Sequence, residues 1–133
     1  MQHESGFQKA FIKDFRELGF FVGAGSLSPG YPDITAIRCN RAILIELKDA
    51  VNVGPKQKVL DLFQRAQVPF YIRYLRPGTE TINIVFKKAS SYYLLTLRQM
   101  NDVKILLNGD WTELVSKCSK FQTIKELVLF ISL

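Results

Sequence analysis

The chain has 133 residues, a length that fits one domain with one core and leaves no room for a separate cofactor domain beside a catalytic one. Apolar residues make up 47% and charged residues 23%, which is typical of a folded protein and excludes a disordered or fibrous one. Lysine and arginine number 18 against 12 aspartates and glutamates, so the formal net charge is +6. This excess favours a polyanionic partner, with nucleic acid first and an anionic membrane surface second.

Cysteine and histidine are too scarce for several kinds of site. Cys39 and Cys118 form no paired motif, which argues against a disulfide scaffold and for a reducing compartment. His3 is the single histidine, so the chain cannot build a histidine-rich zinc site, and a histidine-based triad would depend on a residue near the N-terminus. No apolar run approaches the ~18 residues that span a bilayer. We therefore expect a cytoplasmic protein with no membrane partner.

The first half of the chain is expected to alternate helix and strand. Apolar residues at helical spacing predict a helix over residues 4–18, with Glu4 on its apolar face. A loop rich in glycine and proline follows at 23–32 and leads into a β-hairpin, because two strand-like runs flank a short turn. A helix is expected to start near Pro55 and to end before Pro69. The strands are predicted at 20–22, 34–38, 41–47 and 70–75.

The second half is expected to form an extension packed on the first. A second hairpin is predicted at 81–86 and 92–97, and helical spacing recurs at 98–107 and 123–131. The intervening segment, 111–121, has no assignable pattern. Because about 50 residues are marginal as an independent core, we divide the chain into a core, residues 1–81, and an extension, residues 82–133, within the same domain.

Three polar side chains interrupt the apolar first hairpin. Asp33 stands just before the first strand, while Glu46 and Lys48, two residues apart, point to the same face of the second. A turn between residues 39 and 41 pairs positions whose numbers add up to about 79 to 81, which sets Asp33 opposite residues 46–48. The hairpin is therefore predicted to bring Asp33, Glu46 and Lys48 together.

This group is suited to a divalent metal ion. Two carboxylates about 4 Å apart repel by about 4 kcal/mol at an effective dielectric near 20, so Asp33 and Glu46 need a cation between them. Hard ions with oxygen ligands fit, which indicates Mg²⁺, with Mn²⁺ as a substitute. Protonated Lys48 is no ligand, but it can orient a water molecule or stabilise charge on a phosphate. Alone, a Glu-x-Lys pair is often solvated and an Asp after Pro is often a turn residue; together they favour phosphodiester hydrolysis, with Glu4 as a further candidate.

The segment from Gly30 to Asp33, followed after twelve residues by Glu46, Leu47 and Lys48, resembles the signature of PD-(D/E)XK nucleases. The Glu4 helix and Gln57 resemble the VRR-NUC branch of that superfamily, found as stand-alone phage proteins and as domains of repair enzymes. The resemblance covers about residues 3–76. It implies an α/β fold with a restriction-endonuclease-like αβββαβ core and a mixed sheet flanked by helices, to which the C-terminal hairpin and helices are added.

The same resemblance implies roles for individual residues. Asp33 and Glu46 would bind the metal together with the Leu47 carbonyl, Lys48 would assist the nucleophilic water, and Glu4 would face the site. Gln57, at the start of its predicted helix, becomes a candidate for supporting the site or substrate. In that branch a tyrosine sometimes follows such a glutamine by four residues, whereas position 61 here is Asp.

Basic residues outnumber acidic ones around the predicted site. Between Ile34 and Arg76 there are eight basic and three acidic residues, a bias that suits a phosphate backbone. Loop serines can also reach phosphates, although they often contact only water. The candidate DNA contacts are Ser26, Ser28, Arg38, Lys56, Lys58, Arg73 and Arg76.

These observations and the resemblance lead us to expect a Mg²⁺-dependent DNA endonuclease. The resemblance implies a preference for branched or Holliday-junction DNA and a homodimer, since one site cuts one strand; a phage-encoded protein would act in the host cytoplasm. Two alternatives stay open: a non-catalytic DNA-binding protein of the same fold, and an RNA endonuclease, because nothing in the sequence reads a 2′-hydroxyl.

Overall fold

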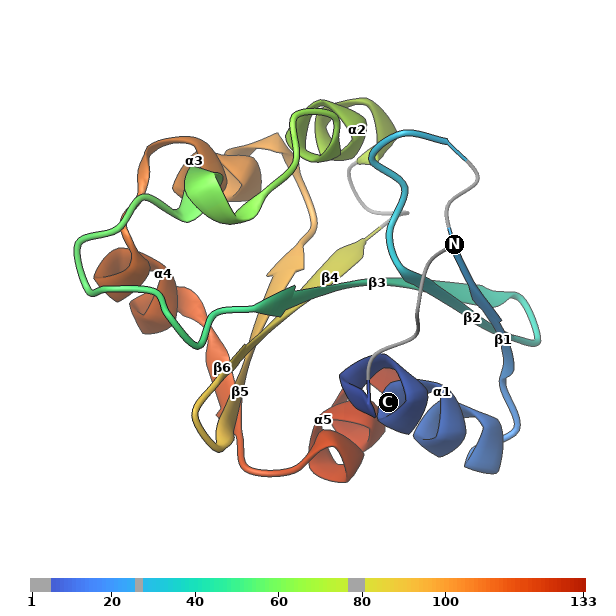
Figure 1. Ribbon diagram of the computed structural model, residues 1–133. Helices are drawn as coiled ribbons and strands as arrows, with labels where there is room; N and C mark the ends of the chain where they lie inside the picture. The colour runs from blue at the N-terminus through green and yellow to red at the C-terminus, as the bar shows by residue number, and fades with distance from the viewer. Residues whose placement is uncertain (1–5, 26–27, 77–80) are drawn as a thin grey trace.

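A computed structural model describes residues 6–25, 28–76 and 81–133. They form an α/β structure with one six-stranded sheet and helices on both of its faces (Figure 1). The strands are β1 (Phe21–Ala24), β2 (Ile34–Arg38), β3 (Arg41–Asp49), β4 (Ile82–Lys88), β5 (Ser91–Leu97) and β6 (Ser119–Phe121). The helices are α1 (Gly6–Glu17), the short 3₁₀ helix η1 (Val59–Leu62), α2 (Gln67–Tyr74), α3 (Met100–Asn108), α4 (Trp111–Lys117) and α5 (Ile124–Ser132).

The strands lie in the sheet in chain order, from β1 to β6. Every neighbouring pair is antiparallel except β3 and β4, which are parallel, so the sheet is mixed as predicted. The parallel pair requires a crossover, which η1 and α2 provide on one face. Helices α2, α3 and α4 lie on that face and helices α1 and α5 on the other (Figure 1). No helix within the described ranges is long and apolar enough to cross a membrane.

Two apolar cores lie on the two faces of the sheet. The core on the α2 side contains Tyr71, Phe86 and Trp111, and the core on the α1 side contains Phe11, Phe15 and Leu127. Side chains alternate between the cores along a strand, so Val85 packs toward α1 while Ile84 and Phe86 pack toward α2. The same alternation places Glu46 on the α2 face, two residues beyond Leu44.

The first hairpin has the predicted register. Arg38 pairs with Arg41 and Ile34 pairs with Ile45, so paired residue numbers add up to 79. The two-residue turn between the strands has a positive φ of 54° at Cys39, a backbone conformation that is common in tight hairpins. The register therefore sets Asp33, one residue before β2, beside the end of β3 that carries Glu46.

The prediction of a strand at 70–75 is wrong, since residues 70–74 belong to α2 and Leu75 follows its end. The residues of this helix that are buried, Gln67, Val68 and Tyr71, share one helical face, and that face packs on the sheet. Pro69 does not end a helix here, because it lies in the first turn, where the backbone N–H groups have no acceptor within the helix. The helix predicted between Pro55 and Pro69 is also wrong, since only the four residues of η1 and the first two of α2 are helical in that range.

The strand that completes the αβββαβ order is β4. It lies between β3 and β5, so the region predicted as an extension supplies three of the six strands. The predicted second hairpin is confirmed as β4 and β5, and the predicted helices at 98–107 and 123–131 are confirmed as α3 and α5. The unassigned segment, 111–121, contains α4 and β6.

Candidate functional site

The structure brings Asp33, Glu46 and Lys48 together at one end of the β2–β3 hairpin. Asp33 accepts a hydrogen bond through Oδ2 from the backbone N–H of Leu47, 3.0 Å away. Lys48 Nζ lies 3.3 Å from Glu46 Oε2 and forms a salt bridge with it. These three residues and Leu47 line one cavity of about 290 Å³, together with Gly25, residues 29–32, Gln64 and the first residue of α2. The sequence prediction that these three side chains meet is thus confirmed.

Glu46 is a buried carboxylate with an incomplete set of partners. Only 2% of the residue is exposed, and Oε1 is buried without a hydrogen-bond partner among the described residues. The pKa of Glu46 is raised from 4.5 to about 7, first by burial and then by the negative charge of Asp33, while Lys48 acts in the opposite direction. The carboxylate is therefore near the middle of its titration at neutral pH. A cation placed against Oε1 would favour its charged form.

Lys48 is held in place on several sides. Its ammonium donates to Gln67 Oε1 over 2.6 Å, in addition to its contact with Glu46. The same ammonium lies 4.6 Å from the centre of the Phe63 ring, in a cation–π contact. Only 11% of the side chain is exposed. A cation so fixed at the wall of a cavity is suited to receive the negative charge of a bound ligand.

Gln67 joins the two charged residues and was missed by the sequence analysis. Its Nε2 donates to Glu46 Oε2 over 2.7 Å, while its Oε1 accepts from Lys48 and from the backbone N–H of Gln64. Tyr71 lies one turn further along α2, and its buried hydroxyl has no hydrogen-bond partner among the described residues. The pKa of Tyr71 is raised by burial and by the charges of Glu46 and Asp33. A signal existed in the sequence: read as a helix, residues 67–75 carry a glutamine on an otherwise apolar face.

The substitution Gln67→Leu is expected to lower the free energy of unfolding by about 2–3 kcal/mol at pH 7. It removes three hydrogen bonds and leaves the Glu46–Lys48 pair short of partners inside the protein. Gln64→Leu is the matched control, because the Gln64 side chain is exposed and only its backbone takes part. The control should change the stability by less than about 0.5 kcal/mol in urea unfolding. Equal losses in both variants would contradict the role given to Gln67.

Gly30 fixes the loop that carries Asp33. It has a φ of +86°, and a Cβ atom on it would lie 2.2 Å from the carbonyl oxygen of Ala66, at the start of α2. Only glycine allows the loop backbone to come this close to the helix. The glycine in the Gly30–Asp33 segment is thus explained by packing between the loop and α2.

The substitution Gly30→Ala is expected to destabilise the protein by about 3 kcal/mol, by adding a steric clash to the cost of a positive φ. Gly25→Ala separates the two contributions, since Gly25 has a φ of +103° and nothing within 4 Å of the added Cβ. We expect it to cost about 1–2 kcal/mol. Thermal unfolding of both variants measures the difference, and an equal loss of stability would rule out the clash.

The predicted phosphate site around Gln57 is not formed. Lys56, Gln57 and Lys58 precede η1 instead of opening a long helix, so no helix start faces a ligand there. The Gln57 side chain accepts a hydrogen bond from the backbone N–H of Gly54, 3.4 Å away, and Gln57 does not line the cavity with Glu46. Lys56 and Lys58 are exposed. The prediction of a helix that starts at this turn is therefore wrong, and the structure places Gln57 outside the cavity lining.

The structure does not bring the other residues predicted to contact the metal or the DNA together at one place. Arg38, at the far end of β2, donates to the Leu18 carbonyl over 2.9 Å and lies over the Phe20 ring, so it supports the fold away from the cavity. Ser28 is exposed in the loop before Tyr31. Glu4 and Ser26 lie outside the described residues; α1, the helix predicted to carry Glu4, packs on the face of the sheet opposite Glu46.

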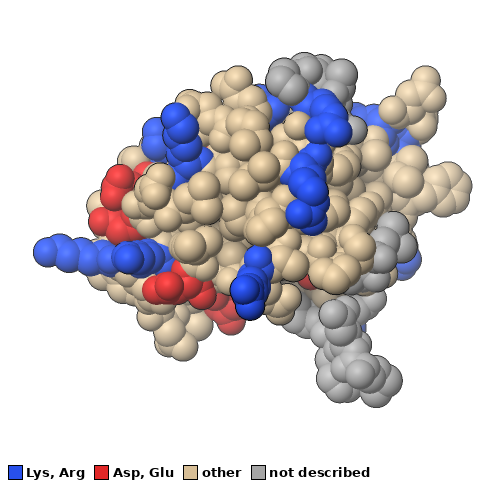
Figure 2. Space-filling view, turned by 90° about the horizontal axis from the view of Figure 1, so that it is seen from above, with Lys and Arg blue, Asp and Glu red and all other residues tan. Residues whose placement is uncertain are grey.

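Arg73 and Arg76 are exposed on α2 and just after it, and Arg65 is exposed just before it. Arg65 and Arg76 thus flank the two ends of the helix whose first residue contacts Glu46, and Arg73 lies in its last turn. Figure 2 shows lysine and arginine side chains spread over the face that carries α2 and α3, with the acidic ones toward the α4 side. We call the three arginines the α2 arginine row.

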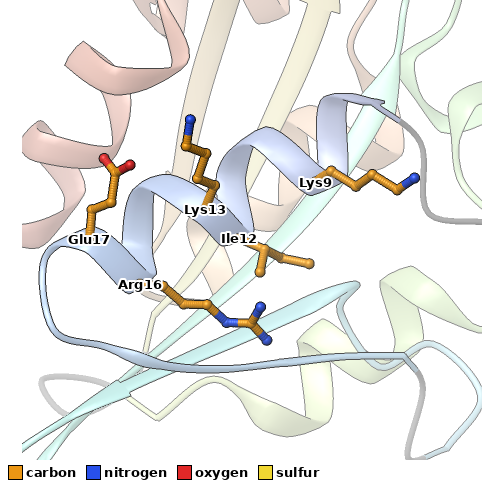
Figure 3. A pocket seen from close by; sticks show the side chains of 5 residues that line it. All are labelled: Lys9, Ile12, Lys13, Arg16 and Glu17. Atoms are coloured by element: carbon orange, nitrogen blue, oxygen red, sulfur yellow. The ribbon is translucent and has the colours of Figure 1, made fainter.

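A second hollow lies along α1 and differs in kind. It has a volume of about 480 Å³ and is lined by Lys9, Ile12, Lys13, Arg16 and Glu17, all on one helix (Figure 3). Its side chains spread apart along the helix surface, as Figure 3 shows. It holds a single carboxylate beside three basic residues, whose positive charge disfavours a divalent cation there.

The donor set around Glu46 fits a magnesium-like ion. Two carboxylates and the Leu47 carbonyl are oxygen donors, and Glu46 Oε1 has no other partner. Mg²⁺ commonly takes one or two carboxylates and fills its remaining positions with water and phosphate oxygens. Among the described residues no group of three or more acidic, histidine or cysteine side chains is placed to hold a metal, so water would complete the shell. Comparison of the sequence with models of known families and with curated proteins finds no match.

Proposed function

We propose that the protein is a metal-dependent nuclease that hydrolyses phosphodiester bonds in DNA. One observation carries this proposal: Asp33, Glu46 and Lys48 meet at the wall of a polar cavity, and one buried oxygen of Glu46 has no hydrogen-bond partner in the part of the chain that the structure describes. Paired carboxylates beside a fixed ammonium suit a reaction at a phosphate, whose negative charge grows as water attacks.

Asp33, Glu46 and the Leu47 carbonyl would hold the ion. Asp33 is oriented for this task because its Oδ2 is fixed by the Leu47 N–H. Glu46 would lose its proton on binding, since its pKa near 7 reflects burial and the charge of Asp33. A bound Mg²⁺ or Mn²⁺ supplies positive charge to the phosphate and lowers the pKa of water.

Lys48 would act on the substrate. Its ammonium is already aligned by Glu46 and Gln67, so little rotamer freedom is lost when it donates to a phosphate oxygen or to the attacking water. Gln67 is a positioning residue, because it contacts Lys48 and Glu46 on opposite sides of its amide. Removing Gln67 would therefore disturb both the metal ligand and the cation.

The spacing of Gln67 and Tyr71 supports the resemblance to the VRR-NUC branch. The tyrosine follows the glutamine by four residues, and both side chains are buried next to Glu46. This is the spacing that the resemblance implies, which the sequence analysis sought at Gln57. The glutamine of the pattern is thus better assigned to Gln67, ten residues later.

DNA is the proposed substrate because of the charge around the cavity. The α2 arginine row begins near Gln67 and offers exposed cations to a phosphate backbone. Contacts of this kind read no base sequence, so they fit an enzyme that selects DNA by its shape. Branched or Holliday-junction DNA, expected from the resemblance, is therefore the first substrate to examine, and a homodimer the first assembly.

The test is a cleavage assay on linear, nicked, flap and four-way DNA, with matched RNA, in Mg²⁺, in Mn²⁺ and in EDTA. We expect metal-dependent cutting of DNA, fastest on a branched substrate, and none in EDTA. Faster cutting of the matched RNA would favour the RNA endonuclease instead. Salt-sensitive binding without cleavage in any metal would indicate a non-catalytic DNA-binding protein.

A further inference from the structure

The sheet face that carries the cavity continues along β2. Ala36 belongs to the core on the α1 side, so its neighbours Thr35 and Ile37 lie on the α2 side. Asp33 lines the cavity two residues before Thr35 and shares its side of the strand. Ile37 is 45% exposed, so the helices on this side do not cover the sheet there. In Figure 1, β1 and β2 extend to the right, beyond α2.

Phe21 of β1 lies on the same uncovered face. It pairs with Ile37 across the two strands, so the two side chains lie side by side. Phe21 is 82% exposed, which leaves most of its ring free for a ligand. A hollow of about 580 Å³ at this place is lined by Arg16, Phe20, Phe21, Val22, Gly23, Thr35 and Ile37. We give the name β1–β2 patch to Phe21, Gly23, Thr35 and Ile37.

The β1–β2 patch adjoins the cavity that holds the paired carboxylates. Tyr31 lines that cavity, and its hydroxyl lies 3.3 Å from the hydroxyl of Thr35, with which it shares a hydrogen bond. Asp33 and Ile37 are four residues apart on one strand, a separation of about 13 Å. About four stacked nucleotides span that distance, at roughly 3.4 Å each. A DNA strand with one phosphate in the cavity therefore reaches the patch within a few nucleotides.

The charge beside the patch suits a phosphate backbone. The described residues that line the hollow include one cation, Arg16, and no carboxylate. Arg16 extends from α1 toward the strand that follows it, where it donates to the Val22 carbonyl over 3.5 Å (Figure 3). It also lines the hollow on α1, beside Lys9 and Lys13. Glu17 is the single acidic residue there, so positive charge continues from the patch along α1.

The same arginine makes the edge of β1 a poor place for a strand of a second copy. Gly25 donates its N–H to the Asp33 carbonyl, so alternate residues of β1 turn their backbone groups toward β2 and Val22 turns its groups outward. Arg16 contacts the outward carbonyl of Val22, which an added strand would need. The surface that stays open to a ligand is therefore the face with Phe21.

We propose that the β1–β2 patch binds the unpaired strand of a branched DNA, with a base stacked on Phe21 and a phosphate near Arg16. Stacking on an aromatic ring accepts any base, and unpaired bases are free to stack whereas those of a duplex are not. The inference rests on the proposed function, because the strand it holds continues from the phosphate in the cavity. It narrows the substrate to DNA with a single-stranded segment beside the cut.

The test is fluorescence anisotropy in EDTA, with a labelled blunt duplex and the same duplex carrying an unpaired arm of about six nucleotides. We expect the arm to tighten binding. Phe21→Ala should weaken binding of the armed duplex roughly tenfold and leave the blunt duplex unchanged, because only an unpaired base stacks. Phe130→Ala is the matched control, since Phe130 is a phenylalanine of α5 that is 51% exposed. It should leave both affinities unchanged.

Phe21→Trp tests the stacking itself. An indole stacks on a base as a phenyl ring does, so this variant should keep its affinity for the armed duplex. The chain has one tryptophan, Trp111, which is 6% exposed. The emission of the new indole is therefore measured as the difference from the unchanged protein. The armed duplex should quench this emission, and the blunt duplex should not.

Several results would overturn the proposal. Equal binding of the two duplexes, no binding of either, an equal loss in Phe130→Ala, or an unquenched Phe21→Trp would each do so. Concentration-dependent association that Phe21→Ala abolishes would also overturn it and assign the patch to a second copy of the chain. The proposed function has a separate outcome. Arm binding that depends on Phe21, without cleavage in any metal, would support the patch and contradict the nuclease, while cleavage with arm binding unaffected by Phe21→Ala would do the reverse.

Discussion

Changing Asp33 to asparagine or Lys48 to alanine is expected to slow Mg²⁺-dependent DNA cleavage at least about 100-fold. The first change removes a charged ligand while keeping the shape of the side chain and an oxygen that can accept the Leu47 N–H. The second removes the ammonium that Glu46 and Gln67 align at the cavity wall. Initial rates on the best DNA substrate, at saturating Mg²⁺, measure both effects.

Gln57→Ala is the matched control for these two variants. The sequence assigns Gln57 to the site, whereas its side chain contacts the N–H of Gly54 and lies outside the cavity. Its cleavage rate should stay within about twofold of the unchanged protein, since a surface change of this kind has a small effect. Full cleavage by either Asp33→Asn or Lys48→Ala, in a variant that circular dichroism shows to be folded, would contradict the catalytic role proposed for that residue.

Glu46→Gln is expected to remove a pH dependence of stability. The pKa of Glu46 is about 7 in the folded protein against 4.5 as its ordinary value, so the folded state holds a proton that the unfolded state has lost between these pH values. The contribution of Glu46 to the stability of the metal-free protein is therefore fully present below pH 4.5. The free energy of unfolding falls by about 3 kcal/mol as the pH rises through 7. A glutamine does not titrate and is free of this loss.

Urea unfolding in EDTA at pH 5 and pH 8 measures the effect. The difference in unfolding free energy between Glu46→Gln and the unchanged protein should shift by roughly 2–3 kcal/mol in favour of the variant over this interval. Comparison of the two proteins cancels the other titrating groups. A difference that stays the same at both pH values would show that burial does not hold the proton on Glu46. The variant should still lose cleavage, because an amide is a poor substitute for a charged ligand.

The part of the site that lies on the β2–β3 hairpin could be predicted from the sequence. A two-residue turn fixes the register of β2 and β3, and the register alone sets Asp33 beside the end of β3 that carries Glu46 and Lys48. These contacts are local in sequence and depend on the two-residue alternation of a strand. The mixed sheet with helices on both faces also follows from the order of the elements.

The part of the site that lies on α2, Gln67 and Tyr71, could not be predicted in the same way. The sequence of residues 70–75 is predicted as a strand because aromatic or aliphatic positions alternate with polar ones. Tyr71 and Gln67, however, share a helical face, and only packing against the sheet decides between strand and helix. Pro69 added to the error, because a proline is compatible with either a helix end or a first turn. The short elements at 111–121 have too few residues for a period to be visible.

We claim that Asp33 and Glu46 together hold one divalent cation, and Mn²⁺ binding can be measured directly by electron paramagnetic resonance. The unchanged protein at pH 8 should bind one Mn²⁺ per chain, Mg²⁺ should displace it, and Asp33→Asn should weaken binding at least about tenfold. Mn²⁺ binding of equal affinity and stoichiometry in both proteins, or none in either, would contradict the claim.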